Sequence, residues 1–152
     1  MNTIDRLIDY DRWANQRITE AVLGLPHDQR ERVARLFAHI ANAMRVWHDR
    51  IVAIDVAPEP WREMSVEEAA AEIATYTEQL VGLIRLKNRQ LRQGIAYRTM
   101  DGIDYQTPLI DILQHLAFHS HYHRGQINAA IRQVGGAPVN VDFIAYQREH
   151  AK

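Results

Sequence analysis

The stretch "TPLIDILQHLAFHSHYHRGQINAAIRQVGG", residues 107–136, carries the signals of one long helix and decides the fold. Thr107 followed by Pro108 predicts the N-cap and the first helical residue. Gly135 and Gly136 predict the C-terminal end, where a glycine is expected after the last turn. The stretch also contains half of the chain's 8 histidines, so the faces of the helix on which they lie matter for function as well.

Three of these four histidines share one face of the predicted helix. Because a helix turns by about 100° per residue, His115 and His123 lie about 40° to either side of His119. That arc also holds the apolar Leu116, so it should face the interior of a bundle. His121 lies about 160° from His119, and we expect it to point to solvent or to a partner subunit.

The spacing of the histidines allows a metal site but does not require one. Two histidines four residues apart are about 6 Å apart along the axis and can share one ion. Three histidines at this spacing span about 12 Å, which is too far for all three to bind one ion. The pattern therefore predicts either an ion held by one pair and a ligand from another helix, or a hydrogen-bonded polar core. In the second helix, His39 and His48 lie about 90° to either side of the apolar arc, and periodicity does not choose between them.

Three further long helices are predicted from apolar periodicity and end signals. Asp28 is the expected N-cap of the second, and Ser65 with Glu68 forms a capping box at the start of the third. These helices cover residues 3–23, 28–54 and 65–92; residues 97–107 predict a small hairpin-like loop, and residues 141–150 a short C-terminal helix. The chain should thus be one all-α domain, residues 1–152, folded as a four-helix bundle. Helices two and three should be antiparallel neighbours, because about ten residues link them.

The composition limits the classes of partner. A formal net charge of -1 gives no electrostatic reason to expect nucleic acid or an anionic membrane. The chain has no cysteine, which excludes disulfides and thiolate ligands. No apolar run approaches the roughly 20 residues that a membrane span needs, so we expect a cytoplasmic protein.

Polar residues within apolar arcs need partners. Asp11 and Asn15 lie in the apolar arc of the first helix. They either form an interhelical hydrogen bond, or lie in a partly open seam, or sit beside the histidines as metal-supporting or substrate-contacting groups. Gly125 predicts the close approach of another helix. Arg124 is either a surface charge or an anion-binding group at the mouth of the site.

Four segments occur together in an order that resembles a known family. They are "YDRWANQRI", "HIANAMRVWHDRI", "DILQHLAFHSHYHRGQI" and "IRQVGGAPVNVDFIAY", and they resemble the DinB/YfiT-like family of small bacterial metal-binding four-helix bundles. The resemblance implies a divalent ion, zinc or nickel, bound by His39, His119 and His123. It gives His115 no ligand role, and we expect His115 beside the ligands.

The resemblance also implies candidate activities and an assembly. Three histidine ligands leave a coordination position open, as in catalytic zinc sites. The leading hypothesis is an S-transferase that joins a low-molecular-weight thiol, such as bacillithiol, mycothiol or glutathione, to a small electrophile. The alternatives are a metal-dependent hydrolase with Asp11 as base, and a non-catalytic, stress-associated binding protein with a structural metal. A homodimer is implied too, with the outward-facing Trp13 and His121 as candidate interface residues.

Overall fold

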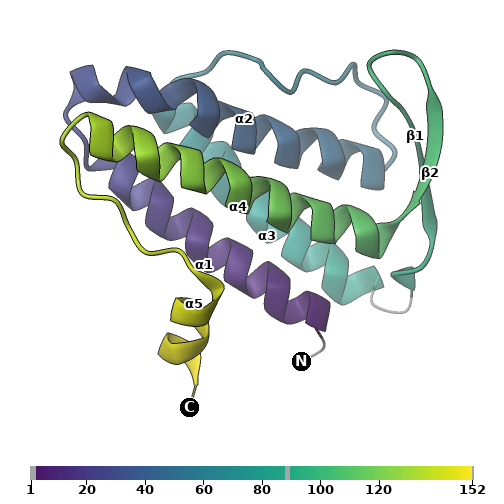
Figure 1. Ribbon diagram of the computed structural model, residues 1–152. Coiled ribbons are helices and arrows are strands. Elements are labelled where there is room, and N and C mark those ends of the chain that lie inside the picture. Colours follow the sequence, from purple (N-terminus) through teal and green to yellow (C-terminus); the bar gives the residue numbers. More distant parts are fainter. Residues whose placement is uncertain (1–2, 88–89, 152) are drawn as a thin grey trace.

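Four long helices form a bundle, with a hairpin at one end and a short helix on its flank (Figure 1). The structure is a computed structural model that describes residues 3–87 and 90–151. The elements are α1 (Thr3–Leu23), α2 (His27–Ile51), α3 (Val66–Lys87), β1 (Gly94–Arg98), β2 (Asp104–Pro108), α4 (Leu109–Gln133) and α5 (Phe143–His150). The predicted four-helix bundle is confirmed. The third helix was predicted to reach residue 92; residues 88–89 lie outside the described residues, but residues 90–92 are not α-helical, so the predicted end is wrong. Over the described part of the chain, no helix is long and apolar enough to cross a membrane.

The direction of α3 relative to α2 differs from the one that we expected. α2 and α3 are parallel neighbours: Arg30 near the start of α2 pairs with Glu67 in the first turn of α3, and further along His48 lies against Tyr76. Figure 1 shows the connecting segment, residues 52–65, running back along the bundle. The prediction of antiparallel neighbours is therefore wrong. Extended residues span about 3.3 Å each and helical residues rise about 1.5 Å, so a short extended linker can retrace a whole helix.

Two of the predicted end signals are confirmed. The amide of Glu68 donates to Ser65 Oγ at 3.1 Å, and the amide of Ser65 donates to Glu68 Oε2 at 2.8 Å, which is the reciprocal capping box. Gly135 follows α4 with φ of 81°, a left-handed conformation that a glycine adopts without a steric penalty. These local interactions fix where α3 begins and α4 ends.

The predicted N-caps of α2 and α4 are wrong by one or two residues. Pro26 and Pro108 occupy these positions, and neither helix start has a side-chain cap. Thr107 is instead paired with Ile95 in the antiparallel hairpin, which extends to Pro108 and leads directly into α4. Asp28 lies in the first turn of α2, where its carboxylate still stabilises the helix through a favourable interaction with the helix dipole.

One apolar cluster runs through all four long helices. Its most deeply buried side chains, each 0–1% exposed, include Ile18, Phe37, Ile40, Leu113 and Ile127. Burying each such side chain contributes about 1.5–3 kcal/mol relative to leaving it exposed. α2 and α4 run antiparallel and side by side across this core, which sets their facing residues opposite one another (Figure 1).

A buried ion pair joins α4 to α1. Arg124 is 0% exposed, and its Nη1 donates to Asp11 Oδ1 and to Asn15 Oδ1, both at 2.6 Å. Asn15 Nδ2 in turn donates to Asp11 Oδ2 at 3.1 Å. The expectation that Arg124 is a surface charge or lies at the mouth of a site is therefore wrong, because it is the cation that the buried Asp11 requires.

Gly125, next to this arginine, does not mark a helix contact. It is exposed, and a Cβ atom built there would meet nothing within 4 Å. The predicted close approach of another helix is thus wrong.

The ion pair leads to a stability prediction. Asp11→Leu leaves the Arg124 guanidinium buried and uncompensated, so we expect the free energy of unfolding to fall by about 3–5 kcal/mol. The double variant Asp11→Leu with Arg124→Met removes both charges and should recover most of that loss. Urea unfolding followed by circular dichroism measures both values; a single variant as stable as the double variant would contradict the expectation.

Candidate metal centre

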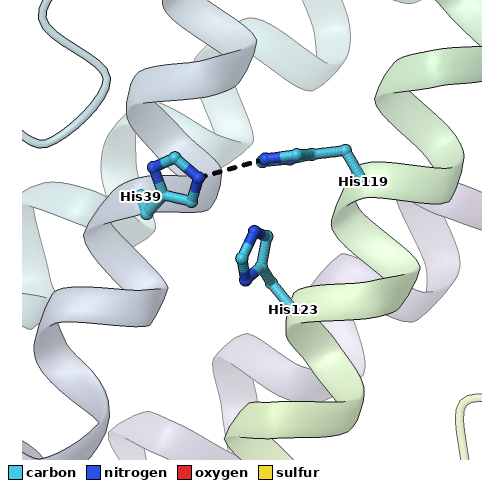
Figure 2. Close-up of side chains that lie close together, drawn as sticks. All are labelled: His39, His119 and His123. Carbon is cyan, nitrogen blue, oxygen red and sulfur yellow. Dashed lines mark hydrogen bonds between the residues drawn. The ribbon is translucent and has the colours of Figure 1, made fainter.

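Three histidine side chains point toward one another between α2 and α4 (Figure 2). His39 comes from α2, and His119 and His123 come from successive turns of α4. One ring nitrogen of each lies within 4.8 Å of the others, and the Nε2 atoms of His119 and His39 are 3.1 Å apart. Nitrogens about 2.1 Å from a tetrahedral ion lie about 3.4 Å from one another, so the separation of the His39 and His119 nitrogens is close to that of two ligands of one ion.

The second ring nitrogens of two of these histidines have acceptors. His39 Nδ1 donates to the backbone carbonyl of Pro60 at 2.6 Å, and His123 Nδ1 donates to Gln126 Oε1 at 2.7 Å. A neutral imidazole with its hydrogen on Nδ1 has a lone pair on Nε2. These hydrogen bonds therefore prepare His39 and His123 to bind a metal through Nε2, the usual support for histidine ligands.

The protonation state of the cluster also suits a metal. Burial, together with the neighbouring His123, His39 and His115, lowers the pKa of His119 to about 3. Burial likewise lowers the pKa of His39, although the hydrogen bond to Pro60 opposes this shift. Both side chains are therefore neutral at neutral pH, as metal ligands must be.

The segment between α2 and α3 forms one wall of the centre. The ring of Trp61 stacks on that of His39, with centroids 3.7 Å apart and planes 6° from parallel. The guanidinium of Arg35 lies 5.1 Å from the centroid of the Trp61 ring, and the fully buried Asn42 donates to the carbonyl of Arg62 at 2.8 Å. From the sequence we expected this segment only to link the second and third helices; Trp61, directly after Pro60, was the available signal of its role.

The structure resolves the choice between two histidines of α2. His39 joins the cluster, while His48 lies against Tyr76 of α3 with its Nδ1 3.1 Å from Asp49 Oδ1. His115 does not fill the seam as its spacing suggested. It is exposed and is not one of the three converging residues, but its ring contacts His119 with centroids 5.6 Å apart.

Asp11 and Asn15 do not support the centre. Their side chains bind Arg124 where α4 faces α1, whereas His119 and His123 lie where α4 faces α2. The expected placement of both beside the histidines is therefore wrong. The interhelical hydrogen bond that was the alternative interpretation describes them correctly.

The two outward candidates for a dimer interface have partners within the chain. His121 is exposed, as predicted, and its Nδ1 lies 2.8 Å from Tyr10 Oη. Trp13 donates from Nε1 to Glu149 Oε2 at 3.0 Å and packs against Tyr146 of α5. An outward tryptophan thus needs no second subunit here, and dimerisation stays a prediction.

A four-helix bundle with three convergent histidines on two facing helices defines a class of candidate metal-binding proteins. The DinB family model matches residues 1–151, and the chain belongs to this family. It is 23% identical to "Protein DinB" of Bacillus subtilis (strain 168) over 158 residues, covering 93% of this chain and 91% of that protein. Its fold matches the crystal structure of a DinB-like protein from Bacillus cereus ATCC 10987 with a TM-score of 0.69 and 17% identity, over 88% of this chain and 92% of that chain.

The hydrogen bond behind His123 gives a testable prediction. Gln126→Leu removes the acceptor of His123 Nδ1, so we expect the affinity for zinc to fall about 10-fold to 100-fold. Gln126→Glu keeps an acceptor and should retain the affinity. Gln133→Leu, an equal change at an exposed position of α4, is the control. Competition titration with a chromophoric chelator measures all three; equal affinities for Gln126→Leu and Gln133→Leu would contradict the proposed support.

The low pKa of His119 predicts how stability depends on pH in the metal-free protein. The folded pKa is about 3. An unfolded histidine titrates near 6.5, so the unfolded chain binds more protons between these values, and stability is lost as the pH falls below about 6.5. Between pH 7 and pH 5 one such group lowers the free energy of unfolding by at most about 2 kcal/mol.

Urea unfolding of chelator-treated protein at several pH values measures this dependence. His119→Asn should flatten the dependence, whereas substitution of the exposed His27 by Asn should leave it unchanged. Identical pH profiles for the wild type and His119→Asn would show that His119 is not the group responsible.

Proposed function

We propose that this DinB-family protein binds one divalent ion, zinc or nickel, through Nε2 of His39, His119 and His123, and that it transfers a low-molecular-weight thiol to a small electrophile. The observation that carries the proposal is the composition of the cluster. Among the described residues it holds three imidazole nitrogens and no carboxylate. A site with three protein ligands leaves a position for an incoming molecule, which a closed structural site does not.

The protein supplies a fixed, neutral set of donors. The carbonyl of Pro60 and the amide oxygen of Gln126 hold two of the rings with their Nε2 lone pairs free. The bound ion would act as a Lewis acid that favours the thiolate form of a thiol in the open position. Burial of His39 and His123 keeps water away from the base of the site.

The surroundings of the cluster favour a thiol over water as nucleophile. The only hydrogen-bond partners of the three histidines, besides one another, are a backbone carbonyl and a side-chain amide within the described residues. Neither can accept a proton from water as a general base. A thiol has a pKa of about 8.5, so it forms its anion without a strong base. Sulfur then bonds to carbon, the leaving group departs with its electron pair, and the thiol proton passes to solvent.

Exposed aromatic side chains beside the cluster support an apolar electrophile. Trp61 is 49% exposed and stacks on His39, and Tyr122 is 64% exposed with its ring 5.1 Å from that of His123. Such rings can pack on a flat or apolar substrate near the open position. The hydrolase hypothesis has less support, because it relied on Asp11 as base and that carboxylate is paired with Arg124.

Metal analysis tests the binding half of the proposal. Protein purified without an affinity tag should hold about one divalent ion per chain, and the double variant His119→Ala with His123→Ala should lose it. His115→Ala and His121→Ala change neighbouring histidines of the same helix and should retain the ion. Equal metal content in the double variant would refute the site.

Catalytic turnover tests the proposed transfer of a thiol. Metal-loaded protein should conjugate glutathione, bacillithiol or mycothiol to 1-chloro-2,4-dinitrobenzene, and the double variant should lose activity at least about 100-fold. Stoichiometric metal without turnover of any thiol would refute the transferase. A large drop in melting temperature on chelation would then favour a structural metal.

A further inference from the structure

A groove on the other side of the bundle is independent of the histidine cluster. It has a volume of about 710 Å³ and is lined by α1, α3 and α5. The histidines belong to α2 and α4, and none of the described residues that line the groove lies on either of these helices. The proposed transferase makes no use of it. Its volume lies within the range of about 300–1,000 Å³ that is typical of small-molecule sites.

The floor of the groove contains a buried hydroxyl without a partner. Thr77 is only 7% exposed, and its Oγ1 has no hydrogen-bond partner among the residues that the structure describes. Asn15 lines the same groove and is 1% exposed, and its amide is held by Asp11 and Arg124. Buried polar atoms are nearly always hydrogen-bonded, so the Thr77 hydroxyl should meet a group that enters the groove.

The walls are aromatic and apolar. Trp13 of α1 and Tyr146 of α5 pack together with ring centroids 5.6 Å apart, and both line the groove with Ile73. On α3 the small side chains of Ala70 and Ala74 leave the space open. Such walls suit a flat apolar body between the floor and the rim.

The rim carries an excess of negative charge. Asp9 and Glu78 both pair with Arg12, at 3.3 and 3.7 Å, so two carboxylates share one guanidinium. Both are much more exposed than the floor, with side-chain exposures of 29% for Asp9 and 68% for Glu78. His150, also at the groove, donates from Nδ1 to the carbonyl of Tyr146. One carboxylate charge therefore remains for a ligand cation.

We propose that this groove binds a small monocationic amine with an aromatic body and a hydrogen-bonding group at its far end. The ammonium group pairs with Asp9 and Glu78 at the rim, the ring packs against Trp13 and Tyr146, and the polar end meets the hydroxyl of Thr77. Each part of the ligand matches a separate feature of the groove, so its parts can be tested one at a time.

Three related probes test the match: tyramine, phenethylamine and 4-hydroxyphenylacetate. On the full chain, tyramine should bind about threefold to tenfold more tightly than phenethylamine, the expected effect of one hydrogen bond. 4-Hydroxyphenylacetate, which carries the opposite charge, should bind at least about tenfold more weakly than tyramine. Calorimetry gives the affinities, and amide chemical shifts should change around Asn15 and Thr77.

Matched variants assign the binding to the groove. Thr77→Val should abolish the advantage of tyramine over phenethylamine. Ala74→Leu fills the groove and should weaken tyramine binding at least about tenfold, whereas Ala71→Leu, an equal change at an exposed position of α3 outside the lining, should not. Because Ala71 and Ala74 are both exposed, this pair stays informative even if Thr77→Val fails to fold.

Several results would overturn the proposal. The first is no binding of tyramine up to about 10 mM, where even a weak site would respond. The second is binding of 4-hydroxyphenylacetate as tight as that of tyramine. The third is a preference for tyramine over phenethylamine that persists in Thr77→Val. A dimer that Ala74→Leu disrupts and Ala71→Leu does not would assign the groove to a second copy of the chain instead. The histidine cluster plays no part in these measurements, so their failure leaves the proposed transferase untouched.

Discussion

The buried contact between Arg124 and Asp11 fixes how α4 is rotated in the bundle. Successive helical residues point about 100° apart, so an arginine held against α1 directs the preceding His123 toward α2. Packing of apolar side chains alone tolerates small rotations, whereas a guanidinium with two acceptors at 2.6 Å does not. The ion pair itself contributes little net stability, because desolvating both charges offsets their attraction. Its structural effect is to orient α4, and the position of His119 and His123 opposite His39 depends on that orientation.

The connection between α2 and α3 has an equally specific effect on His39. Because α2 and α3 are parallel, residues 52–65 must travel back over the outside of α2, and they cross it at His39. An extended crossing segment presents backbone carbonyls, and that of Pro60 orients the imidazole of His39. An antiparallel pair joined by a tight turn would leave His39 without this acceptor. The parallel arrangement of α2 and α3 therefore also provides the acceptor that orients His39.

Much of the fold could be predicted from local signals, and the histidine pair with it. Apolar periodicity gave four helices close to their observed bounds, and the four-residue spacing placed His119 and His123 together, because both depend only on neighbours along one helix. Tertiary contacts could not be predicted in this way. Arg124 looks like a surface residue until Asp11 of α1 faces it, and the choice of His39 over His48 came from resemblance to a family. The predicted direction of α3 was wrong, because the length of a linker limits how far it can reach but does not fix the path that it takes.

The three histidines of the cluster are not equally prepared to bind a metal. His39 and His123 each have an acceptor behind Nδ1, but within the described part of the chain the buried Nδ1 of His119 has no partner. With the hydrogen of His39 on Nδ1, the contact of 3.1 Å between the two Nε2 atoms requires His119 to donate from its own Nε2. Binding of an ion at that atom would require a neutral His119 to carry its hydrogen on Nδ1 instead. His119 would then change its tautomer, and its hydrogen bond to His39 would be lost. His119, the least buried of the three and the one without outer support, is the ligand whose orientation depends most on the ion itself.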